Sequence, residues 1–242
     1  MTAPGLPAAF DGYRIAVVSD VHGKEFGRDN RALLEQVDGL KPDLIALTGD
    51  VIDQADQLAM LPALAKGLSA IAPTYYVTGN HEWALRLVPE IEALLAENGV
   101  IVLNNRWVTL EAMNQHIFLM GADDPNGRAD QKSVGQLAGE LRQTGGEGFL
   151  LLLAHRNNRA EVYDAAGADL TLAGHAHGGL IRLPFTDGLV GPSRELFPTY
   201  TNGLYQLEHG QMVVSRGLGN VGRTRRLFNL PHLPLVVLHC AA

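Results

Sequence analysis

The chain has 242 residues, of which 46% are hydrophobic, and carries a formal net charge of −7. This length is enough to bury a sizeable core in one α/β domain, and the acidic balance argues against a nucleic-acid backbone as the main partner. The single cysteine, Cys240, excludes an intrachain disulfide and a cysteine-rich zinc site, and it suits a reducing compartment.

The N-terminal residues 1–12 are predicted to be an extension that precedes a single domain spanning 13–242. They lack both the basic head and the long apolar segment of a signal peptide or membrane anchor. We therefore expect no transmembrane segment and a soluble, cytoplasmic protein. A chain from which a leader had been removed would look the same, and peripheral contact with a membrane is left open.

The first hundred residues alternate strand-like and helix-like segments. Short β-branched or apolar runs predict strands at 13–18, 44–47 and 74–77. Amphipathic spacing predicts a helix after each strand, at 29–40, 62–68 and 88–98, with Pro62 in a first turn and Gly99 as a C-terminal cap. Polar residues follow each strand, where open α/β sheets place their ligands.

The second half is predicted to contain more strands and fewer helices. A helix is expected at 130–142, and strands are expected at 100–103, 107–110, 116–120, 149–153, 169–173, 204–207, 212–215 and 235–238. Strands in both halves with helices mainly outside them suggest two packed sheets covered by helices.

Polar motifs stand at or just after the end of five apolar runs. They are Asp20-x-His22, Asp50-x-x-Asp53, Asn80-His81-Glu82, His155 and His175-x-His177. Each has an ordinary explanation when taken alone, because such residues are common in turns and a lone histidine is often just hydrogen-bonded. Together they form a mixed carboxylate, amide and imidazole set able to bind metal. Four histidines fall outside this set and are predicted to take no part: His116, His209, His232 and His239.

The order and spacing of these motifs resemble the calcineurin-like metallophosphoesterase family, from Asp20 to Gly179. The resemblance implies a four-layer α/β sandwich, in which two facing mixed β-sheets are flanked by helices. The segment 184–219 is more loosely similar to bacterial phosphohydrolases that are often carried on a membrane-associated N-terminus. We expect no such anchor in residues 1–12.

The same resemblance implies a site with two divalent metal ions. Asp20, His22 and His177 would hold one ion, Asn80, His155 and His175 would hold the other, and Asp50 would bridge them. Mixed nitrogen and oxygen ligands suit Mn²⁺, Fe²⁺ or Zn²⁺, and the family favours Mn²⁺. A water or hydroxide held by the two ions would attack a phosphodiester or pyrophosphate bond in line. His81 would act as general acid or transition-state stabiliser, oriented by Asp53.

The substrate is expected to be a small phosphorylated molecule. The sequence departs from the family after His155, where Arg156 could reach a phosphate, and a second basic cluster contains Arg223, Arg225 and Arg226. The apolar stretches 180–185 and 196–198 could form a wall for an apolar or lipid-like leaving group, or simply cover a sheet. Two alternatives stay open: a non-catalytic metal- or phosphate-binding module, and a mononuclear iron oxygenase.

Overall fold

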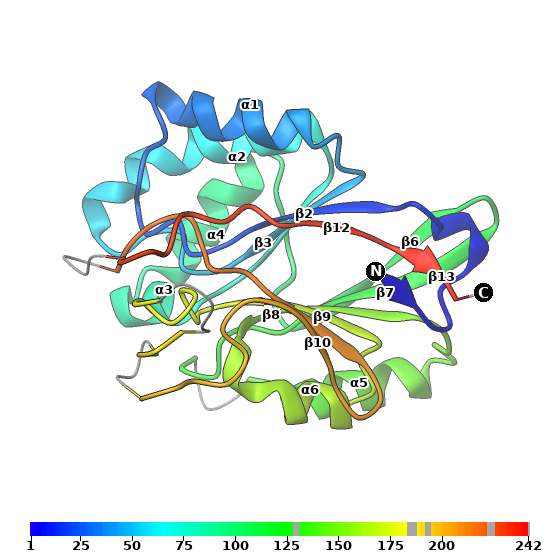
Figure 1. The fold of residues 1–242 in the computed structure, drawn as a ribbon. Helices are drawn as coiled ribbons and strands as arrows, with labels where there is room; N and C mark the ends of the chain where they lie inside the picture. Colours follow the sequence, from blue (N-terminus) through cyan, green and yellow to red (C-terminus); the bar gives the residue numbers. More distant parts are fainter. Residues whose placement is uncertain (128–130, 183–187, 192–194, 222–225, 242) are drawn as a thin grey trace.

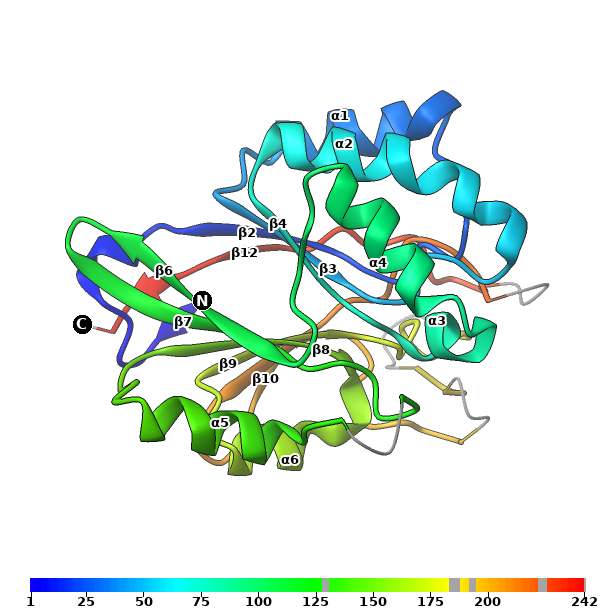
Figure 2. The same cartoon turned by 180° about the vertical axis from the view of Figure 1, so that it is seen from behind.

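The structure is a computed structural model that describes residues 1–127, 131–182, 188–191, 195–221 and 226–241. Two mixed sheets face each other, and helices cover the outer face of each (Figures 1 and 2). This confirms the predicted four-layer α/β sandwich. In the described part of the chain no helix has both the length and the apolarity to cross a bilayer.

The first sheet has the strand order β12-β2-β3-β4-β5. Its strands are β2 (Arg14–Val18), β3 (Leu44–Thr48), β4 (Thr74–Val77), β5 (Ile101–Val102) and β12 (Leu235–Val237). Strands β2 to β5 are parallel, and β12 is antiparallel to β2. The helices that connect them, α1 (Arg31–Gly39), α2 (Leu61–Ile71) and α4 (Val88–Glu97), lie on the outer face (Figure 1).

The second sheet has the order β10-β11-β9-β8-β7-β6. Its strands are β6 (Arg106–Ala112), β7 (Gln115–Gly121), β8 (Leu150–Arg156), β9 (Leu170–Gly174), β10 (Gly203–Gln206) and β11 (Gln211–Val214). The four central strands, β7, β8, β9 and β11, are parallel, and both edge strands are antiparallel to their neighbours. The helices α5 (Val134–Gln143) and α6 (Ala160–Ala165) cover its outer face (Figure 2).

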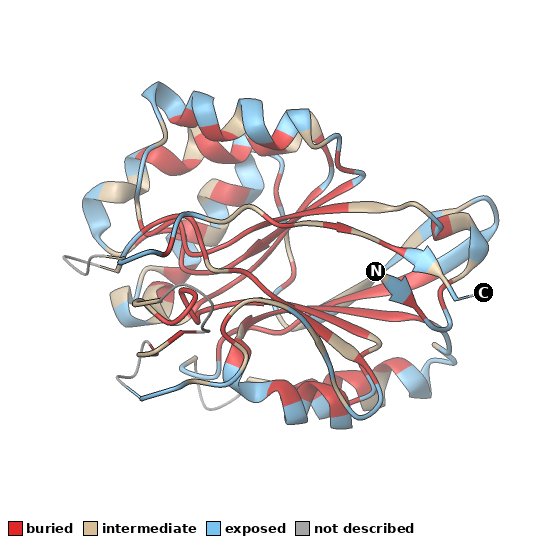
Figure 3. Ribbon diagram, in the orientation of Figure 1, coloured by how far each residue is buried: buried red, intermediate tan, exposed pale blue. Residues whose placement is uncertain are grey.

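Both faces of the central strands are buried, which explains their nearly unbroken apolar sequences. Along β2, Ile15 and Val17 point into the core between the sheets, whereas Ala16 and Val18 pack under the helices of the first sheet. The inter-sheet core also takes alternate residues of β8 and β9, such as Leu151 and Leu172. Figure 3 shows this burial running through the centre of the molecule. The packed strands therefore form a rigid base for the turns at their ends.

The main differences from the sequence predictions occur at helix boundaries. The first helix begins at Arg31 rather than at residue 29, because Asp29 and Asn30 adopt positive φ angles that an α-helix does not accept. The helix expected from residue 130 begins at Val134, after Ser133 caps its N-terminus in a capping box with Gln136. Two short helices had no prediction: α6, and α3 (Asn80–Leu85).

The N-terminal residues, expected as an extension, pack against the rest of the chain. Strand β1 (Thr2–Ala3) pairs with β13 (His239–Cys240) next to the C-terminus. Phe10 is buried and belongs to the core between the two sheets. Other short segments form 3₁₀ helices at η1 (Ala8–Phe10), η2 (Arg28–Asn30), η3 (Ala55–Met60) and η4 (Asn157–Arg159).

Candidate metal centre

The polar motifs predicted from the sequence meet at one end of the two sheets, beyond the carboxyl ends of five parallel strands. The turns after β2, β3 and β4 carry the carboxylates, the amide and two imidazoles, and β8 and β9 bring three further imidazoles from the facing sheet. Most of these side chains are buried, and Asp53, Asn80 and His81 are half-buried. Motifs that lie far apart in the sequence therefore form one compact polar site.

Five of the candidate ligands adopt left-handed backbone conformations. The φ angles are 51° at Asp20, 50° at His22, 52° at Asp50, 65° at His175 and 47° at His177. Such angles are uncommon for residues with a Cβ atom and persist only where the surroundings hold them. At Asp50 the side chain packs closely against Gly79: a Cβ atom at Gly79 would lie only 2.2 Å from the Asp50 Oδ1. The strained turns thus aim these side chains inward at a local energetic cost.

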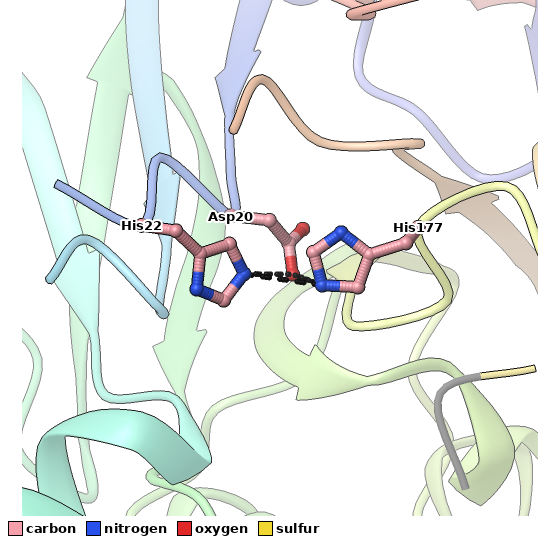
Figure 4. Close-up of side chains that lie close together, drawn as sticks. All are labelled: Asp20, His22 and His177. Carbon is pink, nitrogen blue, oxygen red and sulfur yellow. Dashed lines mark hydrogen bonds and ion pairs between the residues drawn. The ribbon is translucent and has the colours of Figure 1, made fainter. Parts of the chain in front are cut away.

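One group of side chains consists of Asp20, His22 and His177, which point toward one another (Figure 4). The two imidazole Nε2 atoms are 3.1 Å apart, and the His177 Nε2 is 3.5 Å from the Asp20 Oδ1. Two ring nitrogens at this distance share a single proton, or both can direct a lone pair at one cation. The arrangement is therefore suited to a metal ion.

A second group contains Asp50, His155 and His175, whose candidate ligand atoms lie within 4.8 Å of one another. The Nδ1 of His155 is 2.8 Å from the Thr48 carbonyl oxygen, which fixes the ring so that its Nε2 faces the site. This Nε2 lies 3.1 Å from the Asp50 Oδ2 but forms no hydrogen bond, and the nearby Asn80 Oδ1 is likewise buried without a partner. Buried polar atoms rarely lack partners, so both atoms fit ligands of a cation.

The Asp50 carboxylate belongs to the second group and also lies close to the first. Its Oδ2 is 3.9 Å from the His22 Nε2 and 3.1 Å from the His155 Nε2. Its Oδ1 accepts a hydrogen bond from the His81 backbone amide at 2.9 Å. One oxygen atom is thus within reach of both groups, and the other is fixed by the backbone.

The Asp53 carboxylate contacts two histidines at the rim of the site. Its Oδ1 is 2.5 Å from the His22 Nδ1 and 2.8 Å from the His81 Nδ1. Burial raises the pKa of Asp53, but the hydrogen bonds from His22 and His81 lower it more, so the net pKa lies below the usual range. The contact also leaves the His81 Nε2 facing the centre, 3.8 Å from the Asp50 Oδ2.

The histidines of the second sheet differ strongly in their electrostatic surroundings. Burial lowers the pKa of His155, but the negative charge of Asp50, whose Oδ2 lies 3.1 Å from the His155 Nε2, raises it more, to about 10. Burial, reinforced by the charges of His155 and Arg156, lowers the pKa of His175 to about 2. Without a metal ion, Asp50 therefore retains a proton on His155, at the position where a cation would balance its charge.

The sequence motifs did not reveal the role of Glu82, which is fully buried. Its two carboxylate oxygens accept hydrogen bonds from the backbone amides of Asp50 at 3.0 Å, Gly79 at 2.8 Å and Val51 at 2.6 Å. It therefore ties the turn after β3 to the turn after β4. The available signal was its place three residues after Gly79, which is typical of a capping residue at the start of a helix.

Arg156 forms a two-pronged ion pair with Asp124, a second residue that the motifs did not single out. The Nε and Nη2 atoms of Arg156 lie 2.5 Å and 3.1 Å from the Asp124 carboxylate oxygens, and its Nη1 lies 3.2 Å from the His175 Nε2. The guanidinium group thus lies beside His175, and its contact with a substrate phosphate stays a prediction. Arg223 and Arg225, also predicted to contact substrate, lie outside the described residues. Their neighbour Arg226 lies beside the site, with Nη2 3.1 Å from the His177 Nδ1.

Comparison with known proteins identifies the family. Residues 13–179 match the family model described as calcineurin-like phosphoesterase, so the chain belongs to this family of hydrolases. The uncharacterised metallophosphoesterase YkuE of Bacillus subtilis is 30% identical over 241 residues, covering 96% of this chain and 81% of YkuE. Phosphodiesterase YaeI of Escherichia coli is 28% identical over 219 residues, covering 86% and 76%.

Solved structures agree on the fold. A dimetal phosphatase from Danio rerio superposes with a TM-score of 0.53 at 13% identity, covering 86% of this chain and 88% of that one. The NAD nucleotidase of Haemophilus influenzae gives 0.54 at 16% identity, with coverage of 85% and 45%. These likenesses support the shared architecture alone.

Proposed function

We propose that the protein hydrolyses phosphodiester or pyrophosphate bonds with two divalent metal ions held beyond the ends of β2, β3, β4, β8 and β9. The observation that carries this proposal is the position of Asp50, whose Oδ2 is within 4 Å of imidazoles from both groups. A bridging carboxylate of this kind spans two ions about 3.5–4 Å apart. A mononuclear site would leave Asn80, His155 and His175 without a purpose.

Seven side chains are proposed as metal ligands. Asp20, His22 and His177 hold one ion, and Asn80, His155 and His175 hold the other, with Asp50 shared. Two bound divalent ions would supply positive charge to the phosphoryl oxygens and lower the pKa of the attacking water. Mn²⁺ is favoured by the family resemblance, and Fe²⁺ or Zn²⁺ also suit mixed nitrogen and oxygen ligands.

His81 is proposed to protonate the leaving oxygen. Burial lowers its pKa, but the hydrogen bond to Asp53 and the charges of Asp50 and Asp53 raise it more, so the net pKa lies above the ordinary value. The imidazole therefore holds its proton to a higher pH than an ordinary histidine does, and the contact with Asp53 turns the Nε2 toward the centre. Its side chain is 26% exposed, which leaves it accessible to a substrate.

The preference for a diester over a monoester is supported by the relative named phosphodiesterase YaeI. A cytoplasmic location and a single domain over 13–242 stay predictions.

The test measures hydrolysis of bis-p-nitrophenyl phosphate and p-nitrophenyl phosphate by metal-stripped protein. Mn²⁺, Zn²⁺, Fe²⁺ and Mg²⁺ are added separately, and bound metal is counted by elemental analysis. We expect two ions per chain and faster diester cleavage. In Asp50→Asn we expect turnover to fall by about 10⁴-fold, because both ions lose their shared ligand and several kcal/mol of charge stabilisation from each.

Three outcomes would contradict the proposal in different ways. One ion per chain would favour a mononuclear centre. Two ions without turnover of either ester would favour a non-catalytic binding module. Unchanged turnover in Asp50→Asn would show that hydrolysis arises elsewhere.

A further inference from the structure

Large apolar side chains are exposed beside the metal centre. Nine such side chains are exposed among the described residues, and five belong to the segments 195–198 and 226–230. Their exposed fractions are 70% at Leu196, 74% at Phe197, 51% at Leu227, 69% at Phe228 and 76% at Leu230. Water-exposed apolar groups gathered in this way usually mark a binding surface.

Backbone hydrogen bonds join these segments into one unit. The Leu227 carbonyl accepts from the Arg182 amide at 3.0 Å, the Ile181 carbonyl accepts from Leu189 at 2.8 Å, and the Leu189 carbonyl accepts from Phe197 at 2.9 Å. The segments 180–182, 188–191, 195–198 and 226–230 thus lie side by side, and we call them the apolar platform. The part near residue 190 is the gold trace next to α3 in Figure 1.

The apolar platform is attached directly to the loop that carries His175 and His177. The Asn229 Nδ2 donates a hydrogen bond to the His177 carbonyl, and the Arg182 Nη1 donates to the Gly178 carbonyl at 3.0 Å. Gly179 and Gly188 pack backbone to backbone, because a Cβ atom on Gly179 would lie 2.4 Å from the Gly188 Cα. The segments that carry the exposed apolar side chains are therefore joined to the loop of the candidate metal centre.

Two arginines stand where the apolar platform meets the centre. Arg226 donates to the carbonyl oxygens of Gly217 and Gly219, and its Nη2 approaches His177. Among the described residues, the Nε atoms of Arg216 and Arg226 are buried without a hydrogen-bond partner. Cations between an apolar surface and a metal site match a molecule with an anionic head and an apolar tail.

We propose that the substrate is an amphiphilic phosphate ester, with its phosphate at the metal centre and its apolar chain on the apolar platform. The proposal rests on the proposed hydrolase function and narrows its substrate class. Phe197 and Phe228 both hold φ at 53° while their rings face solvent. Bulky residues in this conformation are strained, so the chain maintains an unfavourable geometry to present the two rings.

The test compares methyl p-nitrophenyl phosphate with hexyl p-nitrophenyl phosphate, which share the scissile bond and leaving group. Both are used as monomers, with the metal that supports turnover. Burial of one methylene improves binding by about fourfold, so five further methylenes, buried in part, are expected to lower KM by at least about tenfold. The value of kcat is expected to stay within about twofold.

The variants Phe197→Asn and Phe228→Asn, made together, remove the two rings while asparagine tolerates the positive φ. We expect the chain-length advantage in KM to fall to about threefold or less. Met113→Asn is the matched control, since Met113 is 89% exposed and also has a positive φ, 46°. It lies in the β6–β7 turn at the far end of the molecule and is expected to change nothing (Figure 1).

The outcomes separate this proposal from the hydrolase function. Metal-dependent turnover with the same KM for both esters would reject the amphiphilic substrate and leave the proposed hydrolase function intact. If neither ester is cleaved, calorimetric titration with methyl phosphate and hexyl phosphate measures binding alone. Equal affinities for the two would also reject the amphiphilic substrate. Binding to phosphatidylcholine vesicles without a chain-length effect would assign the surface to a membrane. Self-association weakened by the double variant, again without a chain-length effect, would assign it to a second copy; either result rejects a substrate role.

Discussion

The two sheets contribute different chemistry to the metal centre. The turns of the first sheet carry every candidate carboxylate ligand, the amide of Asn80 and the proposed proton donor, His81. The second sheet contributes the three imidazoles of His155, His175 and His177, with Arg156 next to them. The first sheet therefore supplies the carboxylates and the proposed proton donor, and the second sheet supplies the remaining imidazoles of the proposed ligand set.

The two sheets are also held together differently. Glu82 links two turns within the first sheet through three backbone amides. The histidines of the second sheet instead use partners across the interface: His155 lies against the Thr48 carbonyl, and the His175 amide donates to the Asp20 carboxylate at 3.0 Å. We therefore expect changes at His81 and Glu82 to alter rate and metal affinity, and a change at Arg156, next to the imidazoles of the second sheet, to alter substrate affinity.

His81→Ala should give the largest change among variants that retain both metal ions. General acid catalysis contributes about 10²- to 10⁴-fold, so kcat for the diester is expected to fall within that range. His81 is not among the proposed ligands, so bound metal should stay at two ions per chain. Steady-state kinetics with metal analysis on the same samples checks both parts. Normal kcat would remove His81 from the mechanism, and loss of an ion would make it a ligand.

Glu82→Gln should weaken metal binding by about 10- to 100-fold, as is typical when a residue that positions ligands is changed. A glutamine has one accepting oxygen, so it cannot serve all three amides, and its NH₂ group faces a backbone N–H. The measurement is the metal concentration that gives half-maximal turnover, and saturating metal should restore much of the rate.

Glu92→Gln on α4 is the matched control for this variant. The only hydrogen bond that Glu92 accepts among the described residues is a long one, 3.4 Å, from Asn104. Equal metal affinities in both variants would show that the Glu82 clamp does not position the ligands.

Arg156→Ala tests the second sheet and should raise KM by about tenfold while kcat changes little. A charge-assisted hydrogen bond to phosphate is worth about 1.5–3 kcal/mol, and the partial exposure of Arg156 places the expected effect at the lower end. Arg159→Ala is the control, since Arg159 is exposed on the same segment. A loss of bound metal in Arg156→Ala would instead mean that the arginine positions His175.

The sequence was most informative where chemistry coincides with the end of a strand. Apolar runs such as 44–47 locate the strands, and polar residues at the carboxyl ends of parallel strands in one sheet are expected to meet. Asp50 and His155 lie at the ends of strands of different sheets, and the family resemblance brought them together. The partners of Arg156 and His177 could not be predicted in this way. Asp124 and Asn229 reach them from 32 and 52 residues away, and neither follows a periodic pattern. The helix α3 was also missed, because six residues are too few to show helical periodicity.

The smallest expected effect concerns Asp123, which connects the second sheet to the turn that carries Asn80. Its Oδ1 accepts from the Thr78 hydroxyl at 2.9 Å, and its Oδ2 accepts from the Asn105 side chain at 3.2 Å. Burial raises the pKa of Asp123 to about 6, and the neighbouring charge of Asp124 adds to the rise. The folded state therefore binds this proton more tightly than the unfolded state does.

It follows that the contribution of Asp123 to the free energy of unfolding is largest below about pH 4 and falls as the pH rises to about 6. Between pH 5 and 7 the loss should be about 1–2 kcal/mol. The side chain of the Asp123→Asn variant cannot titrate. Between pH 5 and 7 its free energy of unfolding, measured in urea on metal-stripped protein, should therefore fall by about 1–2 kcal/mol less than that of the unchanged protein. Parallel pH profiles for the two proteins would mean that Asp123 titrates normally, and that the link between the sheets does not depend on its proton.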